Sequence, residues 1–122
     1  MSQNQDTRMY SYIEIGEMAN LGLHLNDLHF DIADWSQKTF GSDAKRGPVG
    51  PLKHLEKEAK EAWQNPKDTE EYADCLILIL DAARRASISP LELIRAAMLK
   101  MTINKKRKWP KPTTDEPVEH TK

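Results

Sequence analysis

Residues 70–85, EEYADCLILILDAARR, contain the longest apolar run of the chain together with several acids. The run itself is Cys75–Leu80; Glu71 and Asp74 precede it, and Asp81 follows it. Six consecutive apolar residues make a helix apolar all round, so we expect this helix to lie at the centre of the fold, covered on every side. Ionised carboxylates are costly to bury. The acids beside the run therefore require an explanation other than burial in the core.

The composition bounds the class of protein. With 122 residues, 39% hydrophobic and 30% charged, the chain is long enough for one soluble domain with a modest core. A net charge of −1 gives no reason to expect nucleic-acid binding, and the single cysteine, Cys75, excludes an internal disulfide and suits a reducing compartment. The sequence has no secretory signal, and no apolar stretch approaches the roughly 20 residues of a membrane span. We therefore expect a cytoplasmic protein without a nucleic-acid or membrane partner.

Apolar periodicity predicts an all-α fold. Apolar residues recur at helical spacing in four segments, at residues 25–40, 52–64, 69–87 and 90–108. Short connections imply a helical bundle, and so small a chain implies that a homodimer or homotetramer completes it. We expect residues 1–8 to be flexible, residues 9–23 to be either a short helix or an extended arm, and residues 110–122 to be a disordered polar tail. The folded domain is then residues 9–109.

Capping residues mark where these helices begin and end. Gly41 is placed to stop the first helix. Asp68 or Thr69 can cap the third, and Ser89, followed by proline and then by Glu92, forms a capping box ahead of the fourth.

Two of the helices each carry a pair of acids three residues apart. In the third helix, Glu71 and Asp74 fall on one face at about 100° per residue, and Asp81 lies two turns beyond Asp74 on that face. The preceding helix carries Glu58 and Glu61. The short connection NPKDT makes the two helices antiparallel neighbours, so the four carboxylates of the two pairs can converge.

Bare carboxylates gathered in this way repel one another and raise their own pKa values. A hard divalent cation removes the difficulty, because Mg²⁺ and Mn²⁺ prefer oxygen ligands. We therefore predict a Mg²⁺ or Mn²⁺ site with four ligands: Glu58, Glu61, Glu71 and Asp74. The alternative is a charged helix face that is simply solvated. A di-iron site would need Glu-x-x-His motifs, which the sequence lacks, and one cysteine with scattered histidines fits zinc poorly.

The last helix ends in the basic segment LKMTINKKRKWP. On a helix, Lys100, Asn104 and Arg107 lie within about 60° of one another. The ammonium of the lysine, the amide of the asparagine and the guanidinium of the arginine would then face the same side of the helix. Together they could bind a polyphosphate. The alternative is that these basic residues only complement the negative end of the helix dipole. A different face of this helix is apolar, and we expect it in the core: Leu91, Ile94, Met98 and Met101.

The order of these features resembles a known superfamily. The segments Glu58-Ala-Lys-Glu61 and Glu71-Tyr-Ala-Asp74, with GPVGPLKHL before them and INKKRKWP after them, are similar to those of the MazG-like all-α nucleoside triphosphate pyrophosphatases. They look closest to the dATP/dGTP diphosphohydrolase branch, to which phage enzymes belong. The similarity covers about residues 25–110.

This resemblance implies hydrolysis of a (deoxy)nucleoside triphosphate between its α- and β-phosphates, which releases the monophosphate and pyrophosphate. It makes the four carboxylates metal ligands, with Glu58 or Glu61 also orienting or deprotonating the attacking water. It leaves Asp81 either supporting those ligands or binding a further metal ion. It also supplies three ligands for the polyphosphate: Lys100, Asn104 and Arg107.

Base recognition then falls to the first helix and the arm before it. Trp35 can stack on the base, although a tryptophan at this spacing can equally belong to the core. Asp31 and Asp34 can accept hydrogen bonds from guanine. We therefore expect a purine deoxynucleoside triphosphate as substrate, with dGTP, and with it GTP, ahead of dATP. The purine preference rests on the resemblance, and the guanine preference rests on these carboxylates. Two alternatives stay open: a non-catalytic helical adaptor, and the same fold acting on another substrate such as phosphoribosyl-ATP.

Overall fold

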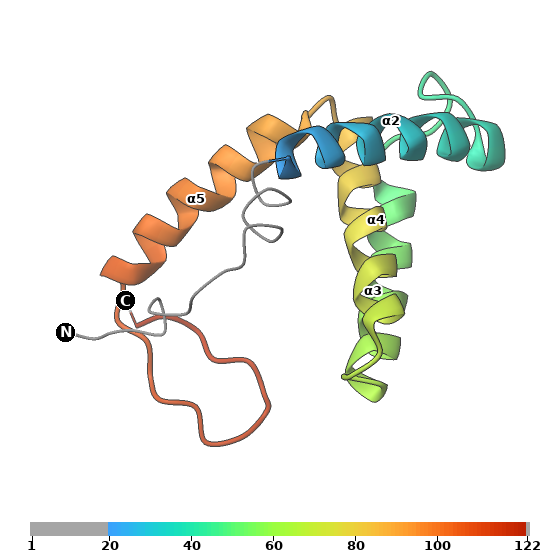
Figure 1. The fold of residues 1–122 in the computed structure, drawn as a ribbon. Helices are drawn as coiled ribbons and strands as arrows, with labels where there is room; N and C mark the ends of the chain where they lie inside the picture. The colour runs from blue at the N-terminus through green and yellow to red at the C-terminus, as the bar shows by residue number, and fades with distance from the viewer. Residues whose placement is uncertain (1–19, 122) are drawn as a thin grey trace.

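The computed structural model describes residues 20–121, and this part of the chain contains four α-helices (Figure 1). Their bounds are α2 Leu21–Phe40, α3 Val49–Gln64, α4 Thr69–Arg85 and α5 Pro90–Lys106. The predictions of an all-α fold and of about four helices are confirmed. Residues 1–8 and most of the undecided segment 9–23 lie outside the described residues; the end of that segment is the first turn of α2.

The helix ends follow the capping residues of the sequence. Gly41 ends α2 with a φ of 115°, which favours glycine, and its N–H donates to the carbonyl of Gln37. Asp68 caps α4, because its carboxylate accepts from the Glu70 N–H at 3.0 Å. At the start of α5, the Ser89 hydroxyl accepts from the Glu92 N–H at 3.1 Å. These caps were predicted and are confirmed.

The helices pack as a hairpin with two further arms. α3 and α4 run antiparallel and side by side, and they make the most extensive contact in the described chain. α2 crosses one end of this hairpin, and α5 leaves from the same end and extends away from it (Figure 1). Residues 20–121 therefore supply a helical hairpin and two arms.

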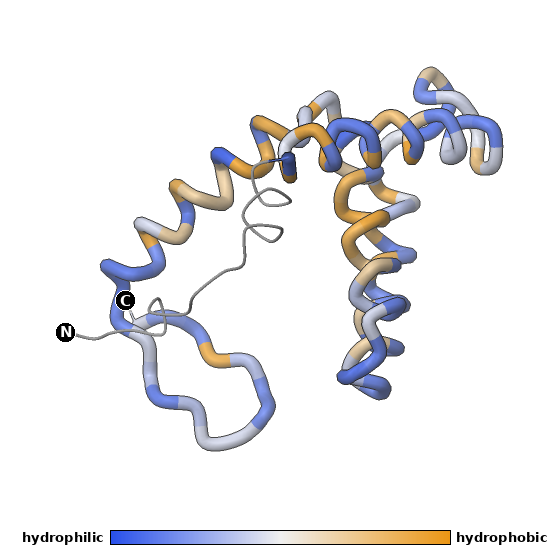
Figure 2. The backbone as a smooth tube through the Cα atoms, viewed as in Figure 1, coloured by the Kyte–Doolittle hydropathy of each residue, from blue (hydrophilic) through white to orange (hydrophobic). Residues whose placement is uncertain are grey.

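The core of the described residues is small and lies where α2 and α3 meet α4. Its buried apolar residues are Ile32, Ala62, Leu80, Ala82 and Ala83. The apolar run that precedes Leu80 was expected to be covered on every side, but Leu76 is 48% exposed in the single chain. The apolar face of α5 is exposed as well; Met98, for example, is 67% exposed. Figure 2 shows apolar residues on α4 and at intervals along α5.

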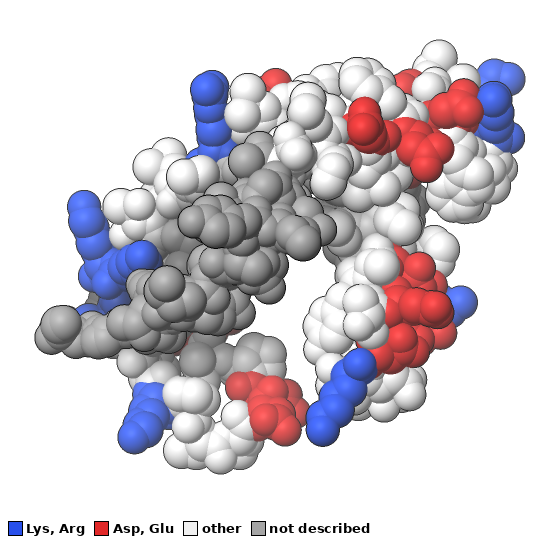
Figure 3. All heavy atoms as spheres, in the orientation of Figure 1, with Lys and Arg blue, Asp and Glu red and all other residues white. Residues whose placement is uncertain are grey.

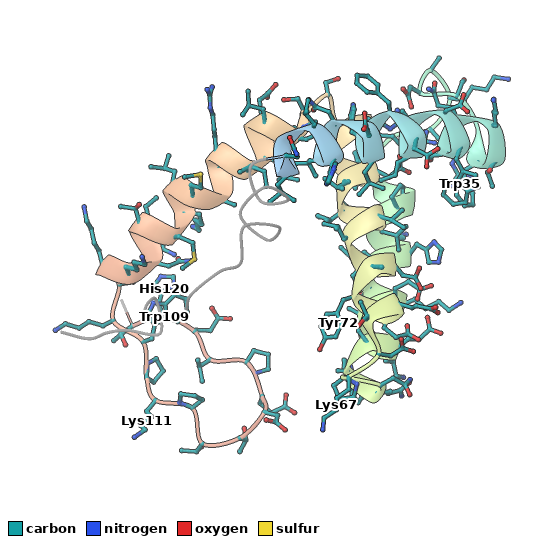
Figure 4. All side chains as sticks on the ribbon, in the orientation of Figure 1. Trp35, Lys67, Tyr72, Trp109, Lys111 and His120 are labelled. Carbon is teal, nitrogen blue, oxygen red and sulfur yellow. The ribbon has the colours of Figure 1, made fainter. Side chains whose placement is uncertain are left out.

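The residues after α5 return to the end of that helix. The Thr121 N–H donates to the Lys108 carbonyl at 2.6 Å, and the rings of Trp109 and His120 meet edge to face at 5.6 Å (Figure 4). The Trp109 indole also donates to the Asn104 carbonyl at 2.9 Å. The polar tail, predicted to be disordered over 110–122, forms no helix in its described part. It returns to the end of α5, where Thr121 pairs with Lys108 and closes a loop. Within residues 20–121, none of the helices has the length and apolar character needed to cross a bilayer.

Candidate active site

The hairpin of α3 and α4 brings three glutamates together. Glu58 and Glu61 lie on successive turns of α3, and Glu71 faces them from the first turns of α4. One carboxylate oxygen of each lies within 4.8 Å of the others, and all three residues are half-buried. The antiparallel pairing expected from the short connection is what places them together. Such an all-oxygen set could hold a divalent metal ion.

Asp74 lies beside this cluster and not within it. It follows Glu71 by about one turn of α4, it is exposed, and it lines the same cavity as Glu58. Figure 3 shows the acidic side chains gathered over one side of the α3–α4 hairpin. Of the four predicted metal ligands, the structure therefore places three in contact distance of a common point and the fourth at its edge.

The charges of the cluster act on one another. The pKa of Glu61 is raised, chiefly by a hydrogen bond with Glu58 and next by the negative charge of Glu58. Desolvation raises the pKa of Glu71, with the charge of Glu61 as the next cause. Burial also raises the pKa of the Cys75 thiol, and the charge of Glu58 adds to it. This mutual repulsion is the condition that a bound cation relieves, so the donor set fits Mg²⁺ or Mn²⁺.

Sequence reasoning missed His54, which belongs to this site. Its Nε2 lies 3.1 Å from Oε1 of Glu58, one turn further along α3. The spacing of four residues on a helix is the signal that could have identified this pair. His54 holds the Glu58 side chain and lines the cavity beside it.

A cavity of about 410 Å³ opens next to the acidic cluster, between α2, α3 and α4. It is lined by Leu28, Asp31, Ile32, Trp35, Phe40, His54, Glu58, Asp74, Ile77 and Leu78. Trp35 is 50% exposed and meets Phe40 edge to face at 5.2 Å, so it forms an aromatic wall and not part of the core. Figure 4 shows it projecting from α2 on the side where the hairpin lies.

The two aspartates predicted to contact the base lie differently. Asp31 lines the cavity together with Trp35. Asp34 lies outside it and pairs with Lys38 at 3.0 Å on the exposed surface of α2. The structure thus brings Asp31, but not Asp34, to the same cavity as Glu58 and Asp74.

The predicted polyphosphate ligands lie far from the acids within one chain. α5, which carries Lys100 and Asn104, extends away from the hairpin, and basic side chains lie along it in Figure 3. Arg107 is not on the helix face, because α5 ends at Lys106 and Arg107 is its C-cap in an extended conformation. A single chain therefore does not unite these residues with the carboxylates.

Asp81 has partners of its own. Its carboxylate is buried and receives hydrogen bonds from Ser36 at 2.6 Å, from Arg84 at 2.8 Å and from Arg85 at 3.4 Å. Asp81 was predicted to support the metal ligands or to bind a metal itself. In the structure both carboxylate oxygens of Asp81 accept hydrogen bonds where α2 packs against α4.

The fold and the site together define a class: a MazG-like helical protein, whose antiparallel helix pair gathers carboxylates beside an aromatic-walled cavity. Residues 28–122 match the family model of the dATP/dGTP pyrophosphohydrolases, and the chain belongs to this family of enzymes. The resemblance stated from the sequence motifs is confirmed.

Two relatives are similar to the chain over most of its length. One is the MazG-like pyrophosphohydrolase of cyanophage S-2L, solved bound to dGDP and three catalytic Mn²⁺ ions per active site. It is 31% identical, with a TM-score of 0.60, over 80% of this chain and 97% of that one. The other is the Eaa protein of Salmonella phage P22, 52% identical over 90 residues. That match covers 74% of this chain and only 27% of the Eaa protein.

Proposed function

We propose that the chain is a metal-dependent pyrophosphohydrolase that cleaves a purine deoxynucleoside triphosphate to the monophosphate and pyrophosphate. The observation that carries the proposal is the meeting of the Glu58, Glu61 and Glu71 carboxylates within 4.8 Å, at the edge of a cavity walled by Trp35. The family, and the dGDP and Mn²⁺ in the cyanophage structure, support it.

The three glutamates would hold Mg²⁺ or Mn²⁺, with Asp74 beside them as the fourth ligand. When bound, the metal lowers the pKa of a coordinated water and offsets negative charge on the phosphates. Glu58 or Glu61 accepts the proton of the attacking water. The water oxygen bonds to the α-phosphorus, the bond from that phosphorus to the bridging oxygen breaks, and its electron pair leaves with pyrophosphate.

The nucleoside occupies the cavity next to the metal ligands. The base stacks on the Trp35 indole, for which any base offers a π-face. Asp31 accepts hydrogen bonds from N1 and N2 of guanine, two donors that adenine lacks. This arrangement favours dGTP over dATP.

A second copy of the chain completes the site. The apolar faces of α4 and α5 are exposed in the single chain, so a homodimer or homotetramer would bury them. A partner's α5 would then bring its basic end to the acidic cluster that the chain's own α5 does not reach. Lys100, Asn104 and Arg107 of that helix would bind the polyphosphate and stabilise the leaving pyrophosphate.

The test is product analysis with dGTP, dATP, dCTP, dUTP and phosphoribosyl-ATP in the presence of Mg²⁺ or Mn²⁺. Pyrophosphate and a deoxynucleoside monophosphate in equal amounts support the proposal. Release of orthophosphate contradicts the bond assigned. No turnover of any nucleotide favours a non-catalytic helical adaptor, and turnover of phosphoribosyl-ATP alone favours that other substrate.

A further inference from the structure

A second cavity, of about 240 Å³, continues from the first one toward the start of α3. The two share Phe40, His54 and Leu78, so they are contiguous. The remaining residues of the second cavity are Arg46, Gly50, Pro51, Asp81 and Arg85.

Arg46 lies over two glycines at the edge of this cavity. A Cβ added to Gly50 would lie 2.9 Å from Nη2 of Arg46, and one added to Gly41 would lie 3.1 Å from its Cδ. The Arg46 carbonyl accepts from Nη1 of Arg85 at 3.1 Å, which anchors the backbone. The guanidinium is therefore seated against the first turn of α3 because residue 50 has no side chain.

The charge of Arg46 is available to a ligand. Within residues 20–121, no carboxylate oxygen lies within ion-pair distance of its guanidinium. Asp81, the acid of the second cavity, already receives hydrogen bonds from Ser36, Arg84 and Arg85. A guanidinium at a cavity edge offers a fork of donors to any pair of acceptors that enters.

The spacing along α3 relates this guanidinium to the metal ligands. Gly50, His54 and Glu58 are each four residues apart and lie on one face of the helix. At 1.5 Å per residue, Gly50 is about 12 Å from Glu58 along the axis. That separation is comparable with the length of a nucleoside 5′-phosphate. A phosphate at Glu58 therefore places the far edge of the base near Arg46.

We propose that Arg46 is a specificity-determining residue that reads the O6 and N7 edge of guanine. Both atoms are acceptors and match two donors of one guanidinium, whereas adenine presents an amino donor beside N7. This inference rests on the proposed function and adds a second contact to it. Asp31 reads N1 and N2 from one side of the base, and Arg46 reads the adjoining edge.

The experiment compares kcat/KM for dGTP and dATP in the full chain with Mn²⁺. Arg46→Ala lowers the dGTP-to-dATP ratio by about tenfold through loss of dGTP turnover. Arg46→Lys lowers it similarly, because the ammonium keeps the charge but not the fork. Gly50→Ala lowers it without touching Arg46 itself, since a methyl at this position displaces the guanidinium and suits a helix. The control is Lys45→Ala, an exposed neighbouring cation, which leaves the ratio unchanged.

The possible failures are separable. If the wild-type chain hydrolyses both nucleotides and the ratio is unchanged in the Arg46 variants, the inference is wrong and the proposed function stands. An equal loss for dGTP and dATP also overturns it, because it assigns Arg46 to the phosphates or to folding. If the wild-type chain hydrolyses no nucleotide, the proposed function fails and this inference fails with it.

Discussion

The hydroxyl of Ser36 on α2 donates a 2.6 Å hydrogen bond to the carboxylate of Asp81 on α4, and both residues are buried. Arg85, whose side chain is only 1% exposed, donates to the same hydroxyl at 2.8 Å and pairs with Asp81. This contact explains how an acid is tolerated directly after the apolar run. It also fixes the helix that carries Trp35 against the helix that carries Asp74, so the shape of the cavity depends on it.

Removing Asp81 should destabilise the fold. Asp81→Ala removes one counter-charge of the buried Arg85 guanidinium and leaves it Asp43, whose Oδ1 lies 3.5 Å from Nη1, so we expect the free energy of unfolding to fall by about 3 kcal/mol. Urea denaturation at fixed protein concentration measures it. The matched control is Asp34→Ala, whose pair with Lys38 is exposed and whose loss should cost less than about 0.5 kcal/mol. Equal losses in the two variants would show that the buried network contributes nothing beyond a surface pair.

Neutralising a metal ligand should separate activity from stability. Glu58→Gln, Glu61→Gln, Glu71→Gln and Asp74→Asn should each remove most turnover while the helical fold is kept. In EDTA, loss of one charge from the crowded cluster should raise the unfolding temperature. Glu56→Gln, an exposed position on α3 outside the cluster, is the control and should behave as wild type. Near-wild-type turnover in any two of the four variants would refute the assignment.

The pH response of Glu61 provides an independent check in the metal-free protein. Its pKa is raised, first by the hydrogen bond with Glu58 and then by the charge of Glu58. A group whose pKa is higher in the folded state stabilises the fold at low pH, and this contribution is lost as pH rises through the raised pKa. As the pH rises through the pKa of Glu61, the Glu58→Gln variant should therefore lose less stability than the wild type. Carboxyl NMR in EDTA should show Glu61 titrating at lower pH in the variant; an unchanged titration would contradict the coupling.

A composite site predicts recovery of activity on mixing. Glu71→Gln removes a metal ligand and Arg107→Ala a phosphate ligand, and each homo-oligomer should be nearly inactive. Unfolding and refolding the two together forms mixed dimers in which one of the two sites has neither defect. A statistical mixture should then regain about a quarter of wild-type activity. If both residues act within one chain, refolding the mixture restores nothing, which is the result that would remove the second copy from the site.

The sequence predicted the features that depend on neighbouring residues. Helical periodicity and capping residues such as Ser89 act within one or two turns, and they set the helix bounds. The short connection between α3 and α4 makes those helices antiparallel, which is why Glu58 and Glu71 could be paired without a structure. Their roles as metal ligands remain predictions.

The features that the sequence did not predict depend on distant contacts or on fine helix geometry. Ser36 is 45 residues from Asp81, and nothing in the local pattern links them. Arg107 was placed on a helix face because the helix was extended two residues too far, whereas its last turn ends at Lys106. The direction of α5 follows from its packing against the rest of the fold, so its separation from the carboxylates could not be read from spacing.

Two aspartates about one turn apart on α2 allow a test of base selection. The test distinguishes a site that selects guanine by hydrogen bonds from a site in which an aromatic ring stacks on any base. Asp31 lines the cavity, whereas Asp34 pairs with Lys38 outside it. If Asp31 accepts from N1 and N2 of guanine, Asp31→Asn should lower kcat/KM for dGTP by about tenfold or more and leave dATP nearly unchanged, because an amide presents a donor to these donors. Asp34→Asn is the matched control and should leave both values unchanged. Measuring kcat/KM for dGTP, dATP, dCTP and dUTP completes the comparison: a wild-type spread below about tenfold, near 1.4 kcal/mol, would mean that Trp35 stacks any base and that no carboxylate selects among them.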